Sequence, residues 1–90
     1  MDPEIKETKQ PTAITVAVFG PLTDIFTENR FRAVVALPAA AADLRTELIR
    51  QFPELTDHRF QMAVDDIIVG PETAVHVAEE IALLPAFAGG

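Results

Sequence analysis

The residues best suited to chemistry stand at the end of the chain, where residues 85–90 read PAFAGG. Two terminal glycines occur by chance in about one chain in 200, because glycine makes up about 7% of residues. No side chain in 81–90 is charged, so the carboxylate of Gly90 would be the only charge there. Glycine lacks a Cβ, so an extended Gly-Gly segment could enter a channel that larger side chains would block. The ending therefore predicts a carboxyl group that other enzymes reach and activate.

This tail is the first candidate site. The residue expected to react is Gly90, and the residues expected to carry it are Pro85, Phe87, Ala88 and Gly89.

The rest of the chain offers no catalytic arrangement. It has no cysteine, which excludes disulfides, thiolate catalysis and cysteine-bound zinc. Its two histidines, His58 and His76, lie far apart and make no metal-ligand spacing. The acidic pairs 65–66 and 79–80 would point to opposite faces of a strand, so neither makes an acid/base pair. We therefore expect no metal site and no bound cofactor.

Composition narrows the classes of partner. The chain has 90 residues, a formal charge of -7 and 49% hydrophobic residues, which predicts one small, soluble globular domain. Nucleic acid and anionic membrane surfaces both require clustered Lys and Arg, and here the seven basic residues are scattered. The longest apolar run, 33–42, is interrupted by Pro38 and is too short to span a bilayer. We expect a cytoplasmic protein that binds neither nucleic acid nor membrane.

Local patterns predict about five strands and one main helix. β-branched and apolar residues indicate the strands, and apolar residues three and four apart indicate the helix. The strands are expected at 14–19, 30–37, 60–64, 67–69 and 80–84, a short helical turn at 22–27, and the helix at 39–52, with Pro38 at its start. Residues 1–12 are polar and are expected to form a flexible arm, so the domain would span 13–84 and the tail 85–90.

These elements predict an α+β fold. One helix packed on a mixed sheet of about five strands would cover the apolar face of that sheet. A central last strand, parallel to the first, gives the β-grasp arrangement.

Strand alternation also predicts a second site, on the other face of the sheet. If Ile14, Val16 and Val18 face the helix, alternate residues must face away. The outward apolar residues near the tail would be Ala17, Phe19, Ala63, Ala82 and Leu84. An exposed apolar patch on a small protein indicates a partner. The alternatives are that a short helix or the arm covers this face, or that a one-residue shift in register exchanges the two faces.

The tail and the strand order together resemble a known family. Residues 77–90, VAEEIALLPAFAGG, are similar to the ending of the small subunit of molybdopterin synthase and related ubiquitin-like sulfur carriers. Residues 14–19 resemble the first strand of that family, and 42–45 with Leu48 resemble its helix. The chain departs from the family pattern at Ala78, Ala86 and Phe87, which leaves the particular pathway open.

The resemblance implies a mechanism. An adenylating (E1-like) partner would use ATP to activate the carboxylate of Gly90, and sulfur would then replace AMP to give a thiocarboxylate. The tail would enter the large subunit of a molybdopterin synthase heterotetramer and donate the sulfur there. The catalytic acids and bases would belong to these partners, so the chain would be a non-catalytic donor subunit.

Three alternative functions stay open. Two of them use the same Gly-Gly ending, and the third does not depend on it. The chain could be a sulfur carrier for thiamin or another pathway. It could be a ubiquitin-like modifier joined through Gly90 to lysines of target proteins. It could also be a β-grasp interaction module whose terminal glycines are incidental.

Overall fold

A computed structural model describes residues 9–26, 28–77 and 79–86. Its strands are β1 (Gln10–Val18), β2 (Arg30–Leu37), β3 (Ala39–Ala40), β4 (Phe60–Val64), β5 (Ile67–Ile68), β6 (Ala74–Val75) and β7 (Ile81–Pro85). Its helices are α1 (Ala41–Gln51) and two 3-10 helices, η1 (Gly20–Asp24) and η2 (Pro53–Asp57).

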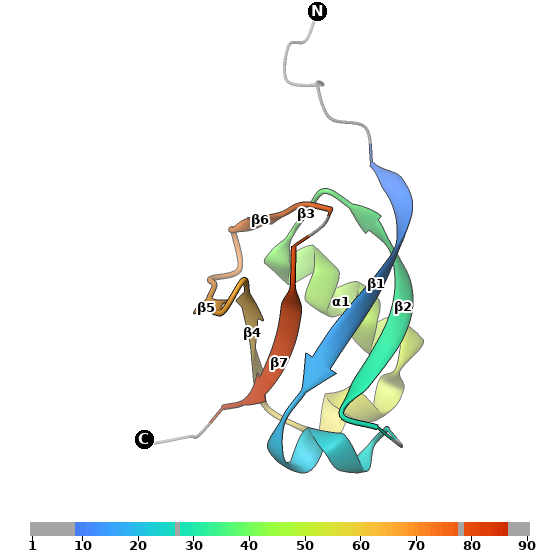
Figure 1. Ribbon diagram of the computed structural model, residues 1–90, viewed down its shortest axis with the longest axis vertical. Coiled ribbons are helices and arrows are strands. Elements are labelled where there is room, and N and C mark those ends of the chain that lie inside the picture. The colour runs from blue at the N-terminus through green and yellow to red at the C-terminus, as the bar shows by residue number, and fades with distance from the viewer. Residues whose placement is uncertain (1–8, 27, 78, 87–90) are drawn as a thin grey trace, which may run out of the picture.

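Five of these strands form one mixed sheet in the order β2-β1-β7-β4-β5, with α1 lying across one face (Figure 1). The last strand, β7, is central: it runs parallel to β1, with Val16 opposite Ile81, and antiparallel to β4. The first two strands are antiparallel along the whole of β2. This topology confirms the α+β β-grasp fold expected from the sequence.

The core lies between the sheet and α1. The residues expected to face the helix from the first strand are buried, with Ile14 8%, Val16 0% and Val18 1% exposed. Leu44 and Leu48 of α1 meet them from the other side. At one end, the rings of Phe26, Phe31 and Phe52 pack together, the closest pair with centroids 4.2 Å apart. The strand alternation predicted from the sequence is therefore confirmed on the core side.

The first strand begins earlier than expected. β1 starts at Gln10, so three residues assigned to a flexible arm are paired with the end of β2. Pro11 is tolerated there because the bonded positions of this ladder alternate, and Val18 is one of them, donating to the carbonyl of Asn29. The backbone nitrogen of Pro11 consequently faces away from β2, so the missing N–H breaks no hydrogen bond of this strand pair. The predicted arm boundary at residue 12 is wrong.

The helix begins later than expected. Pro38 does not occupy its first turn, because residues 39–40 form β3, which pairs with β6 in a segment predicted to be a turn. The Leu37–Pro38 peptide bond is cis. The amides of Ala41 and Ala42 donate to the carbonyls of Thr73 and Pro71, at 2.8 and 3.0 Å. These carbonyls take the place of a side-chain cap, which Ala40 cannot provide.

The other boundaries move by one or two residues. α1 ends at Gln51, one residue before the predicted end, because a residue that precedes a proline is disfavoured in helical conformation. β1 ends at Val18, β5 at Ile68, and β7 is shifted by one residue to Ile81–Pro85.

The turn between β4 and β5 holds two residues in left-handed conformation. Asp65 has φ 52° and Asp66 has φ 70°, which suits the two-residue hairpin turn that favours Asn-Gly. The Oδ1 of Asp65 accepts a hydrogen bond from the amide of Glu80 at 2.9 Å, which ties the turn to the start of β7. The side-chain hydrogen bond described for this turn involves Asp65 and not Asp66. Asp66 occupies the second position of the turn, where glycine is favoured, so its side chain adds a cost to the left-handed backbone.

We expect Asp66→Gly to stabilise the fold. Glycine adopts positive φ without the side-chain penalty, so the free energy of unfolding should rise by about 0.5–1 kcal/mol, even after the greater freedom of the unfolded chain is counted. That corresponds to an increase of roughly 3–6 °C in Tm for a domain of this size, measurable by thermal denaturation. Asp66→Asn removes the charge but keeps a side chain, and it controls for electrostatics. A lower Tm for Asp66→Gly would contradict this account of the turn.

Candidate functional site

The residues with predicted chemistry, Phe87, Ala88, Gly89 and Gly90, lie outside the described residues. The structure does describe the segment that leads to them, which we call the tail root, Pro85 and Ala86. Because β7 runs parallel to β1, the tail root lies at the end of the sheet where β1 also finishes. The geometry of this end determines where the tail begins.

Two contacts fix the tail root. Pro85 pairs with Phe60 of β4, and the amide of Ala86 donates to the carbonyl of Arg59 at 3.1 Å. On the other side stands Gly20, which has φ +63°. A Cβ at Gly20 would lie 2.9 Å from Cγ of Pro85, closer than real Cβ contacts allow. Gly20 is therefore required both by its backbone conformation and by the proline packed against it.

Sequence reasoning missed this role of Gly20. The Gly20-Pro21 pair indicated only the end of a strand. The contact with Pro85 exists because the first and last strands are neighbours, so a closer look at the residues after each of the two parallel strands could have found it.

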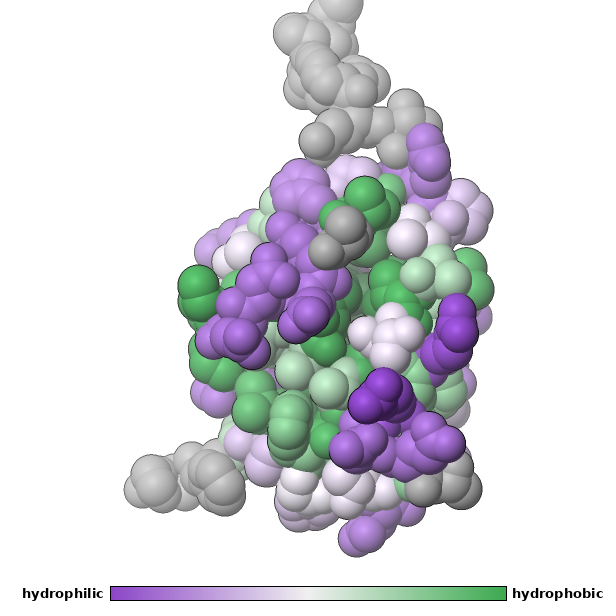
Figure 2. All heavy atoms as spheres, in the orientation of Figure 1, coloured by the Kyte–Doolittle hydropathy of each residue, from purple (hydrophilic) through white to green (hydrophobic). Residues whose placement is uncertain are grey.

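The second candidate site is the face of the sheet opposite α1, which we call the outer face (Figure 2). The structure brings all five predicted patch residues together around one open hollow of about 790 Å³. These residues are Ala17, Phe19, Ala63, Ala82 and Leu84. The strand register explains why, since Ala17 pairs with Ala82 and Ala82 pairs with Ala63. The predicted register and its parity are thus observed.

The five residues do not contribute equally. Phe19 is 48% exposed and stands at the side of the hollow, whereas Ala63 is only 5% exposed and forms part of its floor. Small side chains along the row keep the floor low. The hollow has room for side chains of another molecule because alanines line its centre.

One apolar residue of the outer face was not predicted. Ile68 pairs with Ala63, so it continues the row of alanines into β5, and it is 51% exposed. The sequence analysis treated residues 67–69 as an ordinary short strand. Apolar residues on an edge strand can be exposed because no further strand covers them, and composition alone does not reveal which strand is the edge.

Polar contacts hold the helix to the sheet on the other side. The guanidinium of Arg45 lies 4.0 Å from the centroid of the Phe60 ring and donates to the carbonyl of Phe60 at 3.0 Å. Phe60 is the partner of Pro85, so this contact supports the strand that holds the tail root. Further along α1, hydrogen bonds from Arg50 and Gln51 lower the pKa of Glu47 to about 2. These groups serve the fold and lie away from the outer face.

No cluster of three or more His, Cys, Asp or Glu residues in 9–26, 28–77 and 79–86 is arranged to hold a metal ion. Within the described part of the chain, no helix has the length and apolarity needed to cross a membrane.

Comparison with known proteins gives a family and a fold. A family model described as "ThiS family" matches residues 16–90. No match was found among curated proteins. Among solved structures, the crystal structure of SAMP1 from Haloferax volcanii is 20% identical with a TM-score of 0.68, covering 88% of this chain and 100% of that one.

Two further similar structures have titles that name a molybdopterin converting factor. A putative subunit 1 from Pyrococcus furiosus is 12% identical with a TM-score of 0.71, over 83% of this chain and 98% of that chain. A complex of subunits 1 and 2 from Helicobacter pylori contains a chain 21% identical with a TM-score of 0.57, over 88% of this chain and 100% of that chain. At sequence identities of 12–21%, the similarity to these structures establishes the fold of this chain.

We expect Gly20→Ala to destabilise the protein through the tail root. The methyl group meets Cγ of Pro85 and the backbone keeps a positive φ, so the free energy of unfolding should fall by about 2–3 kcal/mol. Denaturant unfolding measures this. Gly70→Ala is the matched control, because a Cβ there has no neighbour within 4 Å, and it should change stability far less.

A double variant separates the two causes. Pro85→Ala removes the Cγ that the new methyl group meets, so Gly20→Ala should cost less in that background than in the wild type. Equal costs in both backgrounds would show that Gly20 does not act through Pro85.

Proposed function

The chain belongs to the ThiS family, and on that premise we propose that it is a sulfur carrier that serves as the small subunit of a molybdopterin synthase. The observation that carries the proposal is the tail root. Pro85 and Ala86 are held firmly at one end of the sheet, immediately before an uncharged run that ends Gly89-Gly90. A fixed root and a slender ending suit a carboxyl group delivered into another protein's active site.

The proposed reaction begins with the carboxylate of Gly90. A carboxylate is a poor electrophile, so a partner would let it attack the α-phosphorus of ATP, which releases pyrophosphate and forms an acyl adenylate. A sulfur nucleophile supplied by the activating system then attacks the acyl carbon, and AMP leaves with the bonding electrons. Where that nucleophile is hydrosulfide, loss of its proton gives the thiocarboxylate; where it is a persulfide, a thiol must then reduce the acyl disulfide, forming a disulfide with the donor sulfur and releasing the thiocarboxylate. The chain has no cysteine that could compete for the activated carbon.

The proposal requires two partners. One is the adenylating (E1-like) enzyme, and the other is the synthase large subunit, with which the chain would form a heterotetramer. The Helicobacter structure, titled as a complex of subunits 1 and 2 of molybdopterin-converting factor, supports this pairing for a chain of the same fold. The outer face is the proposed contact surface. Because activation consumes ATP, we propose that the protein works in the cytoplasm and binds no cofactor itself.

A second candidate is a ubiquitin-like modifier conjugated through Gly90 to lysines of other proteins. The likeness to SAMP1, titled elsewhere as small archaeal modifier protein 1, favours it. Both candidates use the same adenylation step and differ in what attacks the activated carbon. A carrier for thiamin or another pathway shares the first candidate's chemistry and differs only in the acceptor of the sulfur.

Intact mass spectrometry of the protein from its native host tests the carrier. We expect a fraction of the chains to show the mass gain of one oxygen-to-sulfur exchange, located at Gly90 by fragmentation. The gain should disappear when Gly90 is deleted. An isopeptide bond between Gly90 and a lysine, with no thiocarboxylate, would instead support the modifier.

We expect Phe19→Asp to abolish docking without unfolding the domain. Placing an unpaired carboxylate in an apolar contact should weaken binding to the large subunit by at least about tenfold, measured by calorimetry. Since Phe19 is 48% exposed, Tm should hardly change. Val77→Asp is the control, at an apolar residue that is 52% exposed and does not line the hollow. Undiminished binding by a natively stable Phe19→Asp protein would show that the outer face is not the docking surface.

A further inference from the structure

The outer face carries opposite charges on its two sides. On one side, Arg30 and Arg32 project from β2, where they pair with Ala17 and Thr15. Both are exposed, and we call them the basic rim. The register of β2 places them on the same face as the row of alanines, because paired residues of neighbouring strands point to the same side of a sheet.

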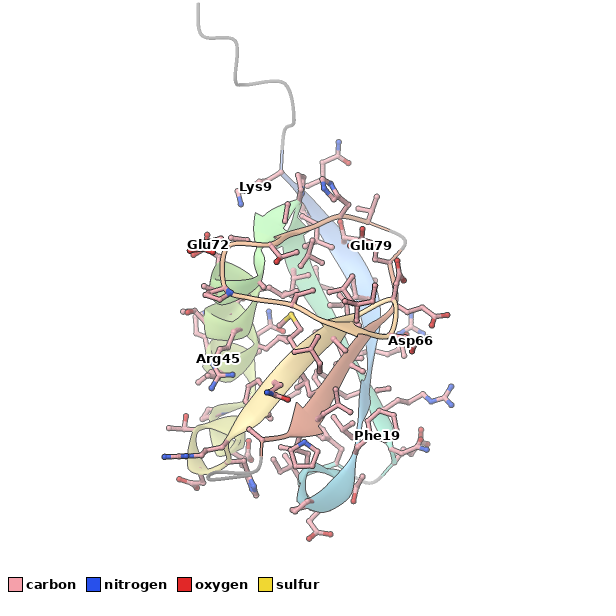
Figure 3. All side chains as sticks on the ribbon, turned by 90° about the vertical axis from the view of Figure 1, so that its left-hand side faces the viewer. Lys9, Phe19, Arg45, Asp66, Glu72 and Glu79 are labelled. Atoms are coloured by element: carbon pink, nitrogen blue, oxygen red, sulfur yellow. The ribbon has the colours of Figure 1, made fainter. Side chains whose placement is uncertain are left out.

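Three carboxylates stand on the opposite side of the hollow. Asp66 belongs to the turn between β4 and β5, and Glu79 and Glu80 precede β7. All three line the hollow, and we call them the acidic rim. Figure 3 shows Asp66 and Glu79 on the same side of the molecule as Phe19, whereas Arg45 and Glu72 lie on the side of α1.

An apolar row of side chains lies beside both rims and begins at Ala17, the partner of Arg30. Ala17, Ala82, Ala63 and Ile68 are paired in succession across the sheet. Figure 2 shows hydrophobic residues across the middle of this face and hydrophilic residues on either side of them. Since adjacent strands lie about 4.8 Å apart, β2 and β7 are about 10 Å apart, which is close to the Debye length at physiological ionic strength. A docked partner would therefore experience the charge of each rim separately.

No residue of either rim makes an ion pair within the part of the chain described here, although Glu28 and Glu54 line a second hollow together with Arg30 and Arg32. The ion pair found among the described residues joins Arg50 to Glu47, on α1. The side chain of Glu79 accepts a hydrogen bond from the amide of His76, which holds the carboxylate in place without cancelling its charge. Both rims are free to meet charges from another molecule.

We propose that these rims fix the orientation in which the adenylating partner docks on the outer face. The partner surface has an apolar centre, carboxylates that face Arg30 and Arg32, and cations that face Asp66, Glu79 and Glu80. This inference rests on the proposed function, because it adds the chemistry of the partner to the same surface. Reversed docking would bring like charges together on both sides, which is strongly unfavourable.

The charge of the whole chain favours an enzyme over a second copy as the occupant. Each copy carries a formal charge of -7, so two copies repel one another even though the rims of one could pair with those of the other. An adenylating enzyme is required by the carrier and by the modifier alike. Correct orientation matters to that enzyme because the fixed tail root must point toward its ATP site.

The test is adenylation kinetics with the purified activating enzyme of the same host, followed by ATP–pyrophosphate exchange. Arg30→Glu/Arg32→Glu reverses the basic rim, and Glu79→Lys/Glu80→Lys reverses the acidic rim. Each should raise the KM for the carrier at least about tenfold and leave kcat nearly unchanged, because the rims act on docking and not on the carboxyl group. At about 1 M salt, where the Debye length is near 3 Å, the defects should shrink.

The two variants control for each other. They change the net charge in opposite directions, so an effect of total charge alone would raise KM in one and lower it in the other, and that result would overturn the proposal. Asp57→Lys/Glu72→Lys makes the same charge change as the acidic-rim variant, on exposed residues that do not line the hollow, and should leave KM close to the wild-type value. Thermal denaturation confirms that each variant is folded.

The remaining outcomes are also decisive. Unchanged KM in both rim variants, with normal exchange by the wild type, would overturn the oriented docking and leave the proposed function standing. No exchange with the wild-type carrier would overturn both. Sedimentation that shows wild-type dimers broken by either rim variant would identify a second copy as the occupant and overturn the assignment to the enzyme.

Discussion

The parallel pairing of β7 with β1 is the constraint on which the rest of the structure depends. It places the last strand between the first strand and β4, so its inward residues, Ile81 and Leu83, are buried at 3% and 0% exposure. The strand that precedes the tail is therefore among the best-supported parts of the molecule. The same pairing sets the alanines of β1 and β7 side by side, which gives the outer face its low apolar floor. The fixed tail root and the outer face share one origin.

The helix is tied to the sheet by contacts that complement this pairing. Its first amides are satisfied by loop carbonyls at Pro71 and Thr73, so a chain with alanines at the helix start still begins the helix at a defined residue. Its middle reaches β4 through Arg45 and Phe60. The loop that supplies those carbonyls lies between β5 and β6 in the chain, and the turn before β5 is bonded to Glu80. Helix, loop and last strand therefore support one another.

Much of the fold could be predicted because its signals are local. Alternation along β1, β4 and β7 depends only on neighbouring residues, and it correctly separated Val16 from Ala17 and Leu83 from Ala82. What could not be predicted depends on segments that meet only in the folded chain. The start of α1 was misplaced because its caps are carbonyls from residues 71–73. Gly20 was read as a strand end because its partner, Pro85, is distant in sequence. Ile68 was missed because edge position is a property of the whole sheet.

The hydrogen bond from the side chain of Gln51 to the carbonyl of Val34, at 2.8 Å, bears on how the sheet avoids edge-to-edge association. β2 is an edge strand, and open edges recruit further strands, which leads to aggregation. Gln51 occupies one outward carbonyl of that edge, and Arg30 and Arg32 add charge to it. The opposite edge, β5, is only two residues long. Gln51 and the two arginines thus protect part of the β2 edge, and the short β5 leaves little of the other edge open, so both edges are poor templates for a strand from another copy.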